Sequence, residues 1–273
     1  MYNKKGSSRF HKHHPNGSIS DISPLTKQNA LFLPDMVSQQ FEHTPPSGAG
    51  GEASKPQTAH TTGVHHPKGR KFLASVVSYI LHPVFLPTAM AAAICWLNLA
   101  AFAGITAQTK WYWLSIIAYL TIFFPLITLL IAWKLKFVES IYLKTQRDRI
   151  IPLIAIMIYY FWVYQVFKRH FHAPLILNVL FLGSFWGIIL LFIGNIFFKI
   201  SMHTTAAGGM IGIMLILMFT GQVNFLIPFL IVLLIAGLIG TARMILNAHS
   251  PLEIWLGYFA GLIAQLGAYW FLT

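Results

Sequence analysis

The distribution of apolar and polar residues divides the 273-residue chain into two unequal parts. Residues 1–71 are polar, rich in Ser, Pro, Gly and His, and show no sustained periodicity of helix or strand. Such a segment buries too little apolar surface to offset the conformational entropy that it loses on ordering. We therefore expect residues 1–71 to form a disordered tail and residues 72–273 to form a transmembrane domain.

From Phe72 onward, long apolar runs alternate with short polar breaks. A helix needs roughly 20 apolar residues to cross about 30 Å of hydrocarbon. The pattern predicts an all-α, polytopic bundle of six to seven transmembrane helices, preceded by an interfacial helix at residues 72–81 that ends at His82-Pro83. The predicted spans are residues 84–103, 111–134, 152–167, 174–198, 204–221, 225–246 and 251–272.

Two features of these spans indicate how they are arranged. Glycines spaced by four residues, Gly208 with Gly212 and Gly257 with Gly261, are typical of helices that approach each other closely. Prolines 152, 174 and 251 are expected near helix starts, where a missing N–H costs little. Counting spans then assigns the tail and the loops at 135–151, 199–203 and 247–250 to one side of the membrane and the C-terminus to the other.

Composition supports the membrane assignment. The chain is 56% hydrophobic and only 10% charged, which is too apolar for an ordinary soluble domain. Its formal net charge is +12, and cations beside membrane spans either set topology or bind anions. The single cysteine, Cys95, permits neither an intrachain disulfide nor a cysteine-based metal site. We expect no metal or other cofactor and no nucleic-acid partner.

The stretch from Arg243 to Glu253 carries the strongest chemical signal. Ser250-Pro251-Leu252-Glu253 predicts a capping box at a helix start, which explains Ser250 and Glu253 in structural terms alone. His249 lies four residues before Glu253, which can accept a proton from one ring nitrogen and leave the other nitrogen free to attack. Arg243 can grip phosphate oxygens through two parallel hydrogen bonds.

Two further stretches fall on the same predicted side. In Ser201-Met202-His203, Ser201 can cap a helix whose free N–H groups suit phosphate, and His203 can protonate a leaving alkoxide. Taken alone, His203 is more typical of a histidine at the membrane interface than of a catalytic residue. The stretch from Lys144 to Pro152 contains Arg149 and, taken alone, is typical of a basic stop-transfer loop.

Together the three stretches resemble the type 2 phosphatidic acid phosphatase superfamily, whose pattern is Lys-x6-Arg-Pro, Pro-Ser-Gly-His and Ser-Arg-x5-His-x3-Asp. Arg243-x5-His249-x3-Glu253 fits the third part, with Ala242 in place of Ser and Glu in place of Asp. The resemblance covers roughly Lys144 to the C-terminus.

The other two parts fit with departures. Ser201 and His203 match the second part, where residues 200 and 202 are Ile and Met instead of Pro and Gly. In the first part Lys144 and Pro152 have the family's separation. Ile151 occupies the arginine position, and Arg149 lies two residues earlier.

The resemblance implies a metal-independent phosphatase. Carried over residue by residue, it makes His249 the nucleophile that forms a phosphohistidine, Glu253 the residue that orients it and His203 the general acid. The residues implied to hold phosphate are Lys144, Arg149, Ser201 and Arg243.

Two functions stay open at this point. The first is hydrolysis of a lipid-linked phosphate monoester or diphosphate, with undecaprenyl diphosphate, phosphatidic acid, phosphatidylglycerol phosphate and lipid A phosphate all possible. The second is a catalytically degenerate lipid-phosphate binder or transporter, motivated by Ile151, Ile200 and Met202, although a His–carboxylate pair is more than binding requires. We expect an integral protein of the bacterial cytoplasmic membrane surrounded by membrane lipids, with the side of the site and the oligomeric state left open.

Overall fold

The computed structural model describes residues 67–97, 100–140, 143, 145–220 and 224–273, all within the compact unit Thr61–Thr273. These residues form helices, turns and loops, and no strand occurs among them. The predicted tail lies outside the described residues as far as residue 66. Its predicted end at residue 71 is wrong, because helix α1 (Lys68–Ile80) begins directly after Pro67, which adopts an extended conformation before it.

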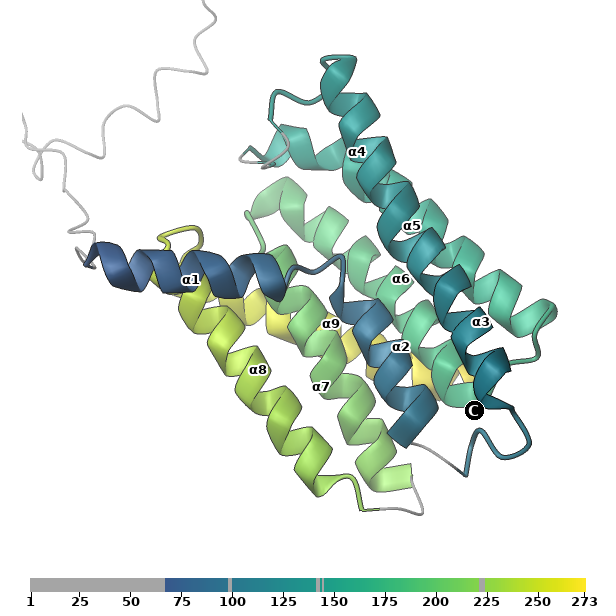
Figure 1. The fold of residues 1–273 in the computed structure, drawn as a ribbon. Coiled ribbons are helices and arrows are strands. Elements are labelled where there is room, and N and C mark those ends of the chain that lie inside the picture. The colour runs from purple at the N-terminus through teal and green to yellow at the C-terminus, as the bar shows by residue number, and fades with distance from the viewer. Residues whose placement is uncertain (1–66, 98–99, 141–142, 144, 221–223) are drawn as a thin grey trace, which may run out of the picture. The chain divides into compact units, whose positions relative to one another are not determined.

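Six helical segments among the described residues are long and apolar enough to cross a membrane, so the chain is an integral membrane protein, and the part described has an all-α fold (Figure 1). The first of them, Ala107–Lys134, is continuous but contains a π-helical turn, η2, five residues long. The turn directly precedes Pro125, whose missing N–H and bulky ring disturb a regular helix. The segments are α3 (Ala107–Ala118), η2 (Tyr119–Phe123) and α4 (Phe124–Lys134), then α5 (Gln146–Arg169), α6 (Leu175–Phe197), α7 (Met202–Thr220), α8 (Leu226–Ile245) and α9 (Pro251–Leu272).

The first of the seven predicted spans is wrong in length. Residues 84–103 contain helix α2 (Leu86–Leu97), whose 12 residues rise only about 18 Å, well short of the hydrocarbon thickness. Turns at residues 100–104, with Gly104 in the left-handed region at φ 80°, follow it. Helix α2 nevertheless runs opposite to α3, so the alternation of direction along the chain is kept (Figure 1).

Helix α5 is longer than predicted. The proline-based start at residue 152 is wrong, because a capping box at Thr145 begins the helix at Gln146. The Thr145 hydroxyl accepts the Asp148 N–H at 3.1 Å, and the Asp148 carboxylate accepts the Thr145 N–H at 3.3 Å. Pro152 therefore lies inside the helix.

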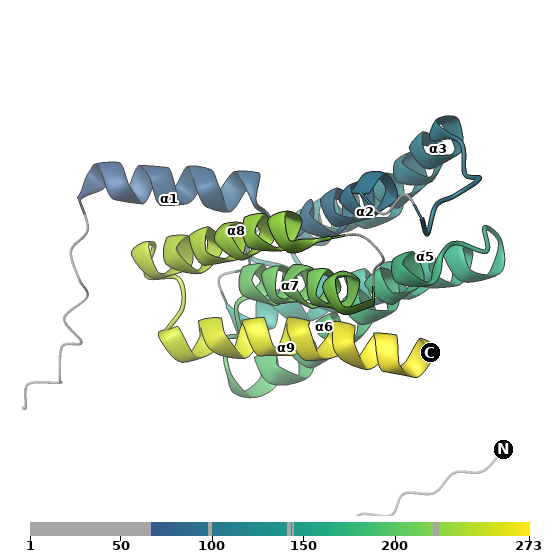
Figure 2. The same ribbon diagram turned by 90° about the horizontal axis from the view of Figure 1, so that it is seen from below.

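Helices α7 and α9 pack side by side and parallel, as Figure 2 shows from below. A Cβ atom on Gly257 would clash with Thr204, and one on Gly261 would clash with the backbone of Thr205. The contacts advance together along both helices, ending where Gly212 meets Gln265. The predicted packing role of both glycine pairs is confirmed, and the parallel register brings the two helix N-termini together.

Helix α1 contacts α8 on one side and leaves its other side exposed (Figure 1). The exposed large apolar residues of α1 recur at helical spacing, and basic residues occupy its first turn. This arrangement agrees with the predicted interfacial helix. The exposed apolar residues are Phe72, Leu73, Val76, Tyr79 and Ile80.

Candidate active site

The turn between α8 and α9 sets the spacing of Arg243 and His249. Helix α8 ends with Asn247 in the left-handed conformation at φ 50°, which Asn tolerates better than most residues. The Ala248 N–H donates to the Arg243 carbonyl at 3.1 Å, and the Asn247 N–H donates to Met244 at 2.9 Å. This Schellman motif ends α8 two residues after Arg243 and reverses the chain, so α9 starts beside the end of α8.

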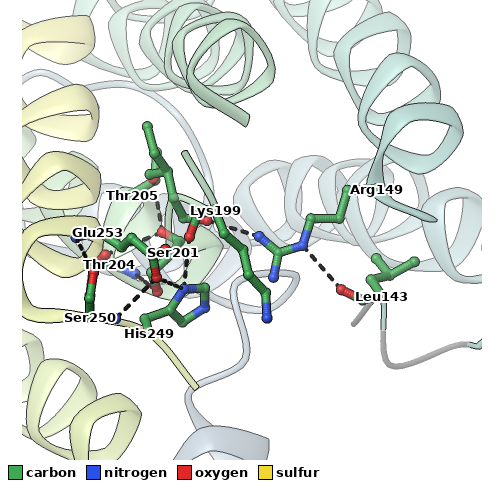
Figure 3. A network of polar contacts seen from close by, with 10 residues as sticks. Leu143, Arg149, Lys199, Ser201, Thr204, Thr205, His249, Ser250 and Glu253 are labelled. Atoms are coloured by element: carbon green, nitrogen blue, oxygen red, sulfur yellow. Dashed lines mark hydrogen bonds and ion pairs between the residues drawn. The ribbon is translucent and has the colours of Figure 1, made fainter. Parts of the chain in front are cut away.

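The predicted capping box at the start of α9 is confirmed. The Ser250 hydroxyl accepts the Glu253 N–H at 3.3 Å, and Glu253 Oε2 accepts the Ser250 N–H at 3.0 Å. The same Oε2 lies 3.2 Å from His249 Nδ1, which is also 2.9 Å from the Lys199 carbonyl (Figure 3). Both neighbours are acceptors, so Nδ1 carries the proton and Nε2 keeps its lone pair.

The environment of His249 keeps its ring neutral. Burial lowers the pKa of His249 to about 4, and repulsion from Arg243 and Arg149 adds to the effect, outweighing the hydrogen bonds to Lys199 and Glu253. At pH 7 the contact with Glu253 is therefore a hydrogen bond from a neutral imidazole to a carboxylate. A neutral ring with a fixed tautomer has the nucleophilic lone pair available.

Two arginines from different helices line the same cavity. Arg149, buried near the start of α5, donates from Nε to the Leu143 carbonyl at 3.1 Å and from Nη1 to the Ile200 carbonyl at 3.0 Å (Figure 3). These bonds use two of the five N–H donors of a guanidinium. Arg243, in the last turn of α8, has a buried Nε without a hydrogen-bond partner among the described residues.

Histidine 203 lies at the start of α7. Its Nε2 is 3.2 Å from the Ser78 carbonyl at the end of α1, and since a carbonyl only accepts, Nε2 carries the proton. The other ring nitrogen, Nδ1, is the one left to exchange a proton. His203 and His249 are thus each oriented by a backbone carbonyl distant in sequence, and neither carbonyl was predicted.

These side chains line one cavity of about 730 Å³. One part of its wall is cationic and rich in histidine, and most of the remainder consists of apolar side chains from α2, α4, α5, α6 and α7. The charged and histidine residues in the wall are His82, Arg149, His203, Arg243 and His249. The structure therefore brings together four of the seven residues predicted from the sequence for the site, and Glu253 touches one of them.

The other two residues predicted for the site, Ser201 and Lys144, are not among the residues described in the cavity wall. Ser201 is completely buried, accepts the Thr204 N–H at 3.4 Å as a helix cap, and is absent from the described cavity wall. Its contact with phosphate stays a prediction. Lys144 lies outside the described residues, so the same holds for it. His82 was missed as a site residue because its sequence context, directly before Pro83, signalled only the end of a helix.

Comparisons with protein-family models, with curated proteins and with solved structures gave no match. Within the part of the chain that the structure describes, no group of three or more His, Cys, Asp or Glu side chains is arranged to hold a metal ion. The fold and the site together define an integral membrane protein with a histidine- and arginine-lined cavity that continues into an apolar interior.

Proposed function

We propose that the chain is a membrane phosphatase that hydrolyses a lipid-linked phosphate monoester or diphosphate through a phosphohistidine. The observation that carries the proposal is the state of His249. Its Nδ1–H faces the Lys199 carbonyl and Glu253, and its ring lines a cavity shared with Arg149 and Arg243. A neutral imidazole beside two guanidinium groups suits attack on a bound phosphoryl group.

In the proposed first step, His249 Nε2 attacks phosphorus, so a P–N bond forms while the P–O bond to the lipid breaks. The neutral His203 ring carries its own proton on Nε2, so Nδ1 first takes up a proton from a hydroxyl of the bound phosphate monoanion and passes it to the leaving oxygen. Proton transfer of this kind is typically worth roughly 10²–10⁴-fold in rate. Glu253 and the Lys199 carbonyl hold the Nδ1 proton and stabilise the positive charge that develops on the ring. Water then attacks the phosphohistidine, releasing phosphate and restoring His249.

The cavity favours a lipid over a water-soluble phosphate ester. Its cationic wall continues into apolar surface formed by membrane helices, with side chains such as Met90, Leu153 and Met210. A substrate can therefore present its headgroup to the arginines while its chain stays in apolar surroundings. These features suit a lipid phosphate or diphosphate and do not select one headgroup.

A lipid-phosphate binder or transporter is the alternative. Arg149 donates two hydrogen bonds to backbone carbonyls, and the Ser201 hydroxyl caps α7. Both are structural roles that a degenerate enzyme would keep. Against it, a binder gains nothing from a histidine whose tautomer is fixed by a carboxylate. Phosphate release separates the two functions.

The test uses purified full-length protein in detergent micelles with EDTA present, and a panel of phosphatidic acid, phosphatidylglycerol phosphate and polyprenyl diphosphate. We expect the unmodified protein to release phosphate from at least one lipid and His249→Ala to be about 10³-fold slower or worse, as for loss of other enzymic nucleophiles. The matched control is His170→Ala, an exposed histidine after α5, which should keep full activity. No release from any lipid supports the binder, and equal rates for His249→Ala disprove the nucleophile assignment.

A further inference from the structure

A third histidine, His82, is held in a fixed orientation by the turn between α1 and α2. The Phe85 N–H donates to the His82 carbonyl at 2.9 Å and closes a turn with Pro83 in second position, where the fixed φ of proline fits. The Val84 N–H then donates to His82 Nδ1 at 3.3 Å. An Nδ1 that accepts a hydrogen bond has no proton, so the proton of the neutral ring is on Nε2.

The ring of His82 belongs to the candidate site. It meets the ring of His203 edge to face, with centroids 5.3 Å apart and planes at 80°. It lines the same cavity as His249 and the two arginines. Burial and the nearby Arg243 guanidinium lower the pKa of His82, which keeps the ring neutral at pH 7.

The segment that carries His82 already serves the site in another way. The Ser78 carbonyl, four residues earlier at the end of α1, accepts from His203 Nε2. The end of α1 and the following turn therefore form one wall of the site, although they lie outside the three sequence stretches that predicted it. Because the Val84 N–H donates to His82 Nδ1, the neutral ring of His82 has one hydrogen-bond donor, which is Nε2–H.

We propose that His82 is a further phosphate-contacting residue, whose Nε2–H donates a hydrogen bond to an oxygen of the phosphoryl group bound beside Arg243 and His249. The inference rests on the anionic ligand of the proposed function and adds a residue to the same site. His82 is not a proton donor, since Nδ1 cannot take up a proton while it accepts the Val84 N–H. Its role thus differs from that of His203, whose Nδ1 exchanges a proton.

Three substitutions separate this role from simple packing. His82→Phe keeps a ring against His203 but removes both nitrogens. His82→Asn offers a carbonyl oxygen to the Val84 N–H and so keeps the turn, but lacks an atom at the Nε2 position. His82→Gln brings an amide N–H close to the position of Nε2. If the donor matters, Phe and Asn both weaken phosphate binding and Gln largely restores it.

The experiment measures dissociation constants of inorganic phosphate and orthovanadate for purified full-length protein, alongside phosphate release from dioctanoyl phosphatidic acid. We expect about tenfold weaker binding for Phe and Asn and a change within about threefold for Gln, as for one hydrogen bond to a charged ligand. Unchanged binding in Phe and Asn overturns the inference, and so does Gln binding as weakly as Phe. Thermal unfolding without ligand shows which variants fold. If His82→Phe does not fold, the binding constants of His82→Asn decide the outcome.

The same measurements separate this inference from the proposed function. If the unmodified protein binds phosphate but releases none from the lipid, hydrolysis is disproved, while the binding constants of the variants still decide the role of His82. If the unmodified protein binds neither phosphate nor vanadate, both proposals are overturned. If it hydrolyses the lipid and all three variants behave alike, only the role of His82 is lost.

Discussion

At the scale of the residue, His249 is controlled by two acceptors of different origin. Glu253 is four residues away on the chain, whereas the Lys199 carbonyl comes from a separate segment 50 residues away. Both compete for the same Nδ1 proton, so the tautomer is fixed even if one contact is lost. Burial and two nearby arginines then lower the pKa of His249 and keep its ring neutral. The stability of the folded protein should therefore depend on pH below neutrality.

The depressed pKa of His249 predicts an acid-dependent loss of stability. Between about pH 6.5 and pH 4 the unfolded chain binds a proton that the folded chain does not, so stability is complete above this window and decreases as pH falls through it. His249→Asn removes the titrating group, and we expect its melting temperature to depend less steeply on pH between 7 and 4. Thermal unfolding at one scan rate, with the exposed His170→Asn as control, makes the comparison. Equal slopes for the His249 variant and the unmodified protein would contradict the prediction.

Part of the residue-scale picture was available from the sequence. The spacing of His249 and Glu253 predicted their contact, because residues four apart lie on one face at a helix start, and the capping box follows from the same four residues. The Ser78 and Lys199 carbonyls could not be predicted, since backbone atoms carry no sequence signal. His82 was hidden for a similar reason: its turn is local, but its neighbour His203 is 121 positions away.

At the scale of the element, the site depends on the parallel packing of α7 and α9. The glycines at their interface let the backbones touch, so that the Ser201 N–H reaches the Glu253 carbonyl at 3.4 Å. The N-terminal ends of both helices are therefore held together, with His203 on one and Glu253 on the other. Anything that separates these helices separates the proposed nucleophile from its proton donor.

A methyl group at Gly261 tests this dependence. Its Cβ would clash with the backbone of Thr205 and Gly209, which cannot move aside as a flexible side chain can. We expect Gly261→Ala to cost about 1–3 kcal/mol through overpacking and to reduce phosphate release. The matched control is Gly237→Ala on α8, where a Cβ meets nothing within 4 Å, so stability should be unchanged or higher. Thermal unfolding and the phosphate assay measure both variants, and equal behaviour would show that the helices can shift without harm.

The helices themselves were largely predictable, and the errors have physical causes. Long apolar runs gave the existence and order of all six spanning segments. The apolar run at residues 84–103 is interrupted by turns that hydropathy does not register, which left α2 short. Hydropathy also failed at α5, whose first turn is polar because it contains the Thr145–Asp148 capping box.

At the scale of the whole domain, the alternation of helix direction assigns the proposed site residues that the structure describes to one membrane face. The starts of α5, α7 and α9 and the end of α8 all contribute to the cavity or its contacts. We expect such a site to lie near the membrane surface, where the headgroup of a lipid can reach the arginines. Counting the predicted spans grouped these residues on one side. The grouping is unchanged although α2 is shorter than predicted, because α2 still reverses the direction of the chain (Figure 1).

Labelling of single cysteines tests the grouping in membranes. The background is Cys95→Ala, which removes the only native cysteine. Exposed positions at the two ends of α5, Arg147 and Arg169, and the final residue, Thr273, are replaced by Cys one at a time. Helix α5 rises about 36 Å over its 24 residues, enough to separate its ends across the bilayer.

From Arg169 the chain crosses four times, through α6, α7, α8 and α9, so Thr273 returns to the side of Arg169. We expect a membrane-impermeant maleimide to label Arg169→Cys and Thr273→Cys from one side of sealed membranes and Arg147→Cys from the other. Permeabilised membranes serve as the control in which all three react. Because Arg147 adjoins the cavity residue Arg149, the side that labels it is also the side of the site. Labelling of Arg147→Cys and Thr273→Cys from the same side would mean that one of the five helices α5 to α9 does not cross, and the common membrane face of the site would then be wrong.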